Sequence, residues 1–214
     1  MAQNEAFEMR GPAGRLEAIL IHPETPPVAA AVVCHAHPLQ GGMMHFKVVF
    51  RAAKALQASG LGALRFNFRG VGLSEGAHDL GIGEQDDVST ALDELERRFP
   101  DLPLVLGGFS FGSVMALRVA ARDPRPAAVF ALGFPIASIP ESSFVSAVTK
   151  PRLFVQAEND SFGGREAITS FVDRLPEPRQ LRVIKGSDHF FTGHLEELQG
   201  TIETWAAARP WQRA

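Results

Sequence analysis

The chain has 214 residues, of which 45% are hydrophobic and 21% are charged, and its formal net charge is -3. This size predicts one globular domain over residues 1–214, and the charge argues against binding to nucleic acid or to an acidic membrane surface. Tyrosine is absent, which excludes phenol chemistry, and a lone cysteine excludes an internal disulfide.

The first residues show neither the basic nor the apolar segment that is typical of a secretory signal. No apolar run approaches the roughly 20 residues that cross a membrane. We therefore expect a cytoplasmic protein with no membrane partner, either a monomer or a homodimer.

Apolar periodicity in the first half of the chain predicts alternating strands and helices. The expected elements are an edge strand at 16–20, a buried strand at 28–33, a helix at 46–56, a buried strand at 61–66 and a helix at 84–99. The last of these helices has an acidic first turn and a basic last turn, which suit the helix dipole.

The same alternation continues in the second half. It predicts strands at 104–106, 127–132, 153–156 and 181–184, with helices ending near 122, at 168–175 and at 195–205. Such regular alternation is typical of a doubly wound, mostly parallel sheet with helices on both faces. The segment 133–152 is too short to form a sizeable cap domain.

The most informative motif is Gly108-Phe109-Ser110-Phe111-Gly112, which lies between a predicted strand and a predicted helix. Two glycines allow the sharp turn of a nucleophile elbow, which leaves a serine hydroxyl exposed at the end of its strand. A tight turn without catalytic function is the alternative. We interpret Ser110 as the candidate nucleophile.

A serine nucleophile needs a histidine base, and that base needs a carboxylate to orient it. In an open sheet, such groups gather beyond the carboxyl ends of the strands. Asp160 follows the strand at 153–156, with Glu158 as a competing acid, and a helix cap is its other possible role. The order serine, aspartate, histidine is the order of the α/β-hydrolase triad.

The predicted base is His189, which follows the strand at 181–184. His194 competes with it, but His194 is expected to begin the last helix as a surface residue. Asp188, next to His189, is expected to be exposed.

The oxyanion of an acyl-transfer reaction needs backbone donors. One expected donor is the N–H of Phe111, directly after the nucleophile, and the other is the N–H of Leu39 in the loop after an early strand. That loop also contains Cys34, His35 and His37. A metal site is the alternative interpretation of these three residues, but the chain shows no further ligand motif at metal spacing.

The segment 67–74, which contains Arg69, has two glycines of a dinucleotide-binding fingerprint but lacks the third. It also lacks the lysine of a phosphate-binding loop. We interpret it as a glycine-turned loop in which Arg69 holds neighbouring backbone.

Taken together, these motifs resemble those of the α/β-hydrolase superfamily, in particular its small, cap-less bacterial serine hydrolases related to dienelactone hydrolases and S33-type aminopeptidases. The matching blocks are 37–42 with 47–49, 65–74, 108–112, 159–160 and 188–191. The resemblance implies a carboxylic ester hydrolase that works through an acyl-enzyme without a cofactor. Two positions depart from the family pattern, since Pro38 stands for the usual glycine and Asn67 for the common aspartate.

We therefore expect a serine hydrolase that acts on small-molecule esters with short- to medium-chain acyl groups. Four apolar side chains are predicted to line the acyl site: Phe109, Phe134, Ile136 and Phe190. The alternatives are a peptidase or amidase, a binding protein that retains the fold, and a thioesterase. A thioesterase acting on CoA esters would place basic residues at the pocket mouth, for which Arg69 and Lys150 are candidates.

Overall fold

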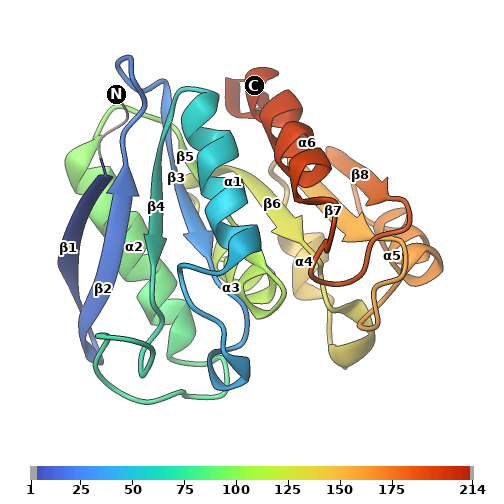
Figure 1. Ribbon diagram of the computed structural model, residues 1–214, viewed down its shortest axis with the longest axis horizontal. Helices are drawn as coiled ribbons and strands as arrows, with labels where there is room; N and C mark the ends of the chain where they lie inside the picture. Colours follow the sequence, from blue (N-terminus) through green and yellow to red (C-terminus); the bar gives the residue numbers. More distant parts are fainter. Residues whose placement is uncertain (1–3, 213–214) are drawn as a thin grey trace.

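The computed structural model describes residues 4–212, and its centre is an eight-stranded sheet with helices against both faces (Figure 1). The strands lie in the order β1-β2-β4-β3-β5-β6-β7-β8, antiparallel from β1 to β4 and parallel from β4 onward. They are β1 (Asn4–Gly11), β2 (Gly14–Ile21), β3 (Ala29–Cys34), β4 (Leu61–Phe66), β5 (Leu104–Phe109), β6 (Pro126–Leu132), β7 (Arg152–Ala157) and β8 (Arg179–Ile184). The prediction of a doubly wound, mostly parallel sheet is confirmed.

The helices divide between the two faces of this sheet. They are α1 (Lys47–Ala58), α2 (Glu84–Arg98), α3 (Phe111–Ala120), α4 (Phe144–Ala147), α5 (Arg165–Val172) and α6 (Leu195–Ala207). One apolar core packs α1 and α6 against one face, and a second packs α2, α3 and α5 against the other. Because both faces are covered, every residue of β3, β4, β5 and β7 is buried, which explains their mainly apolar sequences; the polar exceptions are Arg65, Arg152 and Gln156.

The antiparallel end of the sheet differs from the prediction. The expected edge strand is β2, but it is an inner strand, because β1 pairs with it along the outer side. β1 was missed because its sequence NEAFEMRG alternates charged and apolar residues, with most of its outward positions exposed. A half-exposed edge strand carries a weaker apolar signal than a central one.

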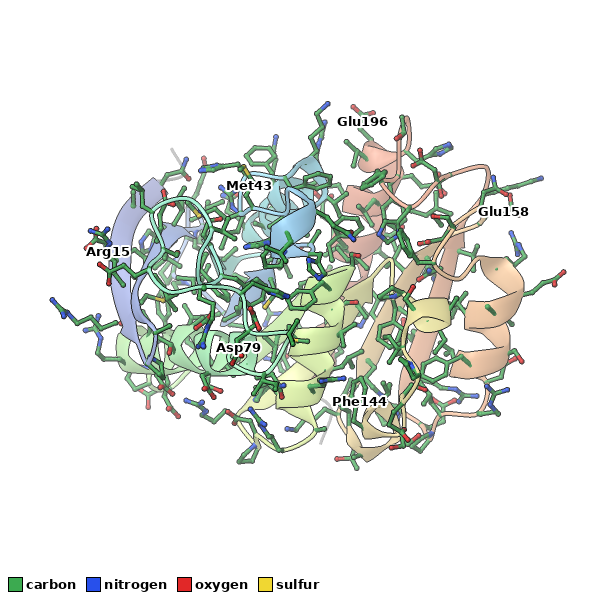
Figure 2. The ribbon with its side chains drawn as sticks, turned by 90° about the horizontal axis from the view of Figure 1, so that it is seen from below. Arg15, Met43, Asp79, Phe144, Glu158 and Glu196 are labelled. Carbon is green, nitrogen blue, oxygen red and sulfur yellow. The ribbon has the colours of Figure 1, made fainter. Side chains whose placement is uncertain are left out.

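Beyond the carboxyl ends of the parallel strands, residues 4–212 form no cap domain. The segment between β6 and β7 contains a short 3-10 helix, Ile136–Ser138, and the single turn α4. Figure 2 looks onto this edge of the sheet, where loops from several strands meet. Within residues 4–212, none of the helices is both long and apolar enough to span a bilayer.

Candidate active site

Ser110 stands at the turn between β5 and α3, with φ of 53° and ψ of -121°. A non-glycine residue with this positive φ is strained and persists only where the surrounding structure holds it. Here the Ser110 N–H donates to the Leu132 carbonyl on the neighbouring strand at 2.9 Å. The strand-turn-helix setting that the motif predicts is therefore present.

The two motif glycines are required by close backbone packing. A Cβ on Gly112 would lie 2.4 Å from the carbonyl oxygen of Cys34, and a Cβ on Gly108 would lie 2.6 Å from the carbonyl carbon of Gly112. Neither backbone can move without displacing β3 or the elbow.

We expect Gly112→Ala to lower the free energy of unfolding by about 1–3 kcal/mol, because the new methyl group overpacks against main chain. Gly200→Ala is the matched control, because that helical glycine has open space around its Cβ position. The control should raise stability by about 0.5–1 kcal/mol. Denaturant unfolding measures both changes, and a neutral Gly112→Ala would contradict the packing argument.

Three side chains from separate loops form a hydrogen-bonded chain with Ser110 at one end. His189 Nε2 lies 3.0 Å from Ser110 Oγ, and His189 Nδ1 lies 2.8 Å from Asp160 Oδ2. Asp160 follows β7 and His189 follows β8, so adjacent strands bring the pair together. With Nδ1 donating to the carboxylate, Nε2 is free to accept the serine proton.

This chain of side chains is shielded from water, except at the serine. The Asp160 side chain is 0% exposed and the His189 side chain 6%. The imidazole is enclosed by the rings of Phe109, Phe162 and Phe190, with centroid distances of 5.0, 4.7 and 5.3 Å. A dry environment strengthens the interaction between the carboxylate and the imidazole.

Gln156 is a further residue of the site, and we did not anticipate its role from the sequence. Its Nε2 donates to Asp160 Oδ2 at 3.0 Å and to the Gly163 carbonyl at 2.8 Å, while its Oε1 accepts from the Phe134 N–H at 2.9 Å. The other carboxylate oxygen of Asp160 accepts from the Phe162 N–H at 2.8 Å. The sequence signal that could have indicated this role is a polar glutamine near the end of a strand that is otherwise largely apolar.

The competing candidates are engaged elsewhere. Glu158 binds Arg165 at 2.7 Å and accepts the Gly186 N–H at 2.8 Å. The pKa of the Glu158 carboxyl is lowered mainly by the hydrogen bond from Gly186 and next by the one from Arg165. His194 is the residue before the first turn of α6, and its Nδ1 lies 3.4 Å from Glu197 Oε2. Asp188 accepts backbone N–H groups two and four residues ahead, so it shapes the loop that carries His189.

The two predicted oxyanion donors differ in their surroundings. Phe111 is the first residue of α3, so its N–H has no acceptor within the helix. The Leu39 N–H already donates to Nδ1 of His37 at 3.2 Å. In this bond His37 caps a 3-10 helix, Pro38–Gln40. Leu39 would have to exchange this bond for an oxyanion.

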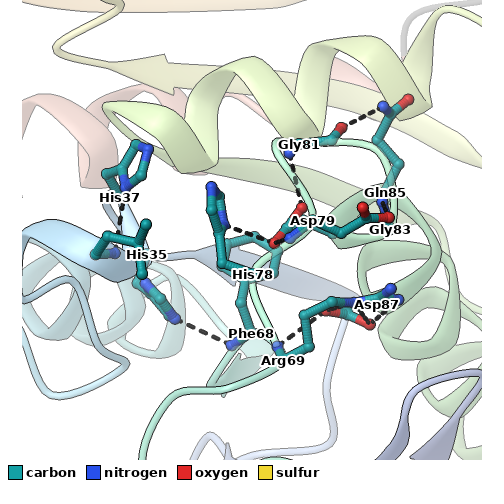
Figure 3. A network of polar contacts seen from close by, with 12 residues as sticks. His35, His37, Phe68, Arg69, His78, Asp79, Gly81, Gly83, Gln85 and Asp87 are labelled. Carbon is teal, nitrogen blue, oxygen red and sulfur yellow. Dashed lines mark hydrogen bonds and ion pairs between the residues drawn. The ribbon is translucent and has the colours of Figure 1, made fainter. Parts of the chain in front are cut away.

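His35 and Cys34 are structural in their contacts. His35 is fully buried, accepts the Phe68 N–H on Nε2 at 3.0 Å, and lies 2.6 Å from the Ala36 carbonyl through Nδ1 (Figure 3). Burial raises the pKa of the Cys34 thiol far above its usual range. Within residues 4–212, no group of three or more His, Cys, Asp or Glu side chains is placed to hold a metal ion.

Burial lowers the pKa of His35 to about 4, whereas an unfolded histidine has a pKa near 6.5. The unfolded chain therefore binds a proton first, and stability is lost as the pH falls from about 6.5 to about 4. We expect this group to remove about 3 kcal/mol over that window. Unfolding free energies of wild type and His35→Gln at pH 7 and pH 4 test this, since the variant should lose correspondingly less. Equal losses would contradict it.

The loop between β4 and α2 is held by polar contacts rather than shaped for a nucleotide (Figure 3). Arg69 binds Asp87 at 2.7 Å, which raises the arginine pKa, and Asp87 also accepts the Arg69 N–H at 3.0 Å. Glu84 accepts two backbone N–H groups of the same loop and lies 2.8 Å from Nδ1 of His78. Asn67 accepts the Met44 N–H at 2.8 Å, which ties this loop to the segment before α1.

A cavity of about 290 Å³ opens beside Ser110. Its lining residues are His37, Gln40, Leu80, Ser110, Phe111, Val114, Met115, Arg118, Pro135, Ser138, Ile139, Pro140 and Phe162.

None of the four side chains predicted for the acyl site is among these lining residues. Phe109 and Phe134 are fully buried, because Phe109 packs on the His189 ring and Phe134 stacks on Phe171 in the core. Ile136 is partly buried over Gly163. Phe190 is half exposed and lines a separate groove with Phe46 and Lys47. The walls of the cavity come mainly from α3 and the segment 135–140.

Several known proteins are similar to this chain in sequence and in architecture. A family model described as alpha/beta hydrolase domain matches residues 29–208. An uncharacterized protein of Rickettsia prowazekii is 36% identical over 91% of this chain and 85% of its own length.

Two solved structures are similar over almost their full length. An alpha-beta serine hydrolase homologue from Coxiella burnetii is 36% identical, with a TM-score of 0.86 over 94% of this chain and 96% of its own. An a/b serine hydrolase without lid from Xanthomonas campestris is 33% identical, with a TM-score of 0.88 over 99% of this chain and 96% of its own. The chain therefore belongs to the alpha/beta hydrolase domain family.

Proposed function

We propose that this protein is a serine hydrolase that cleaves carboxylic esters with short- to medium-chain acyl groups. The observation that carries the proposal is the hydrogen-bonded chain from Asp160 through His189 to Ser110, with bonds of 2.8 and 3.0 Å. The size of the cavity beside Ser110, about 290 Å³, supports a small acyl group.

In the proposed mechanism, Ser110 Oγ attacks the ester carbonyl while His189 Nε2 takes the hydroxyl proton. The imidazolium that forms is stabilised by the buried Asp160 carboxylate, and it then protonates the leaving alcohol. Water, activated by His189 in the same way, attacks the acyl-enzyme and releases the acid.

The oxyanion of each tetrahedral intermediate would accept the Phe111 N–H, aided by the positive end of α3. Leu39 is the proposed second donor, after its N–H leaves His37. The loss of one such donor typically lowers turnover about a hundredfold to a thousandfold.

The test is a series of p-nitrophenyl esters of rising acyl length, assayed beside an aminoacyl anilide. We expect ester turnover that declines once the acyl chain outgrows the cavity, with no anilide turnover. Anilide turnover would instead indicate a peptidase or amidase, and no turnover of either substrate would favour a binding protein.

A thioesterase acting on CoA esters gains no support from the two basic residues considered for it. Arg69 is bound to Asp87, and Lys150 Nζ donates to the Asp123 carbonyl at 2.6 Å. Both cations are held inside the protein's own hydrogen-bonding network.

A further inference from the structure

The charge of the cavity beside Ser110 is opposite in sign to the net charge of the protein, which is -3. Among the described residues that line it, none is an aspartate or a glutamate, and the one permanent cation is Arg118. The remaining lining is largely apolar, and burial lowers the pKa of His37, which favours its neutral form. An anionic group in the cavity would therefore meet the positive charge of Arg118 and no carboxylate of the lining.

Arg118 lies on the same face of α3 as the apolar wall. Phe111, Val114, Met115 and Arg118 follow the spacing i, i+3, i+4 and i+7, which places them along one stripe of a helix. Ser110 directly precedes Phe111, the first residue of this helix, and the rise per residue puts Arg118 about 10 Å beyond Phe111 along the helix axis. The cavity thus has a nucleophile at one end and a guanidinium at the other.

The guanidinium is not neutralised by the protein. Its Cζ lies 5.2 Å from the ring centroid of Phe144, which Figure 2 labels, and it makes no hydrogen bond or ion pair with any residue in the range 4–212. By contrast, Arg125 binds Asp93, Asp123 and Glu96. An arginine held over an aromatic ring with its donors unused is ready to bind a planar carboxylate.

We propose that Arg118 binds a carboxylate at the far end of the acyl group, so that the preferred substrates are monoesters of dicarboxylic acids. This inference rests on the proposed function. An extended chain of about six carbons, together with one hydrogen bond to the guanidinium, is about 10 Å long, which matches the axial rise from Phe111 to Arg118. Hydrolysis adds water across the ester bond and releases the alcohol and the free dicarboxylate.

The proposed placement of the acyl group uses the position of the base and of a second groove beside it. His189 must hand its proton to the leaving oxygen, and we place the alcohol beside Phe190, one of the rings that pack on His189. A second groove, of about 560 Å³, opens there and is lined by Phe46 and Phe190 among others. The acyl group would then bind in the cavity along α3, where Arg118 lies.

The experiment compares two p-nitrophenyl esters of adipic acid that differ at the far end, one with a free carboxylate and one with a neutral methyl ester. The readout is the ratio of their kcat/KM values. Arg118→Gln should lower the ratio of acidic to neutral ester by about tenfold to a hundredfold. Arg118→Lys, which keeps the charge but not the planar fork, should restore part of it.

Arg122→Gln is the matched control, because this exposed arginine lies one turn further on and does not line the cavity. It also removes a cation near the carboxyl end of α3, so it accounts for any effect on the helix dipole. The control should keep the wild-type ratio. Independently of any variant, the preference of the wild-type enzyme for the acidic ester should weaken as ionic strength rises.

The outcomes separate the two proposals. If wild type hydrolyses both esters and Arg118→Gln keeps the wild-type ratio, the role of Arg118 is overturned while the esterase proposal stands. If wild type hydrolyses neither ester nor any member of the neutral series, the esterase proposal itself fails. Should Arg118→Gln not fold, a salt-independent ratio in wild type would overturn the inference.

Discussion

Ser110→Ala is expected to lower kcat for ester hydrolysis about a millionfold while leaving the fold intact. The change removes the hydroxyl that His189 contacts at 3.0 Å, and no acyl-enzyme can form without it. The strained backbone is unaffected, because alanine and serine place the same Cβ at a φ of 53°. Turnover of a p-nitrophenyl ester and labelling by a fluorophosphonate probe measure the loss.

Ser138→Ala is the matched control for this variant. Ser138 lines the same cavity, but its hydroxyl makes no hydrogen bond with a residue of the described range. It should keep both turnover and labelling. A Ser110→Ala protein with full activity would rule out the nucleophile, and labelling of Ser110 that is unchanged in His189→Ala would rule out the base.

Asp160→Asn is expected to lower kcat about ten-thousandfold with little change in structure. An asparagine amide would donate to His189 Nδ1, so the proton would move to Nε2 and point at Ser110. The imidazole would then be unable to accept the serine proton. Measurement of kcat for wild type and variant, with a thermal melt for each, separates this effect from unfolding.

Glu158→Gln distinguishes the two acids that the sequence offers near β7. Glu158 is paired with Arg165 and bound to the Gly186 N–H, whereas His189 contacts Asp160, so the neutralisation of Glu158 should leave kcat almost unchanged. If Glu158→Gln lost activity and Asp160→Asn kept it, the proposed orientation of His189 would be wrong.

Much of the fold could be predicted because its central strands are buried on both faces. β3, β4, β5 and β7 appear in the sequence as mainly apolar runs, and the structure confirms them to within a few residues at each end. β1 escaped prediction because it is a half-exposed edge strand. Its place beside β2 depends on hydrogen bonds between backbones, which leave little trace in composition.

The site divides in the same way. The elbow around Ser110 is a local motif, because the glycines that permit it lie within two residues of the serine. Gln156 was missed because its role consists of hydrogen bonds to Asp160, Phe134 and Gly163. These partners come close to it only when the loops fold. Leu39 illustrates the opposite case. The sequence motif predicts its N–H as an oxyanion donor, but in the structure this N–H donates to His37.

By itself, the sequence determined the alternation of strands and helices, the elbow, and the order of Ser110, Asp160 and His189 along the chain. Those features follow from periodicity and turn chemistry, which act between neighbours. Only the tertiary structure decided which side chains line the cavity, which acid faces the imidazole, and that Arg118 lies there without an anion. Such facts depend on contacts between segments far apart in sequence, where packing and desolvation rather than local preference choose the partners.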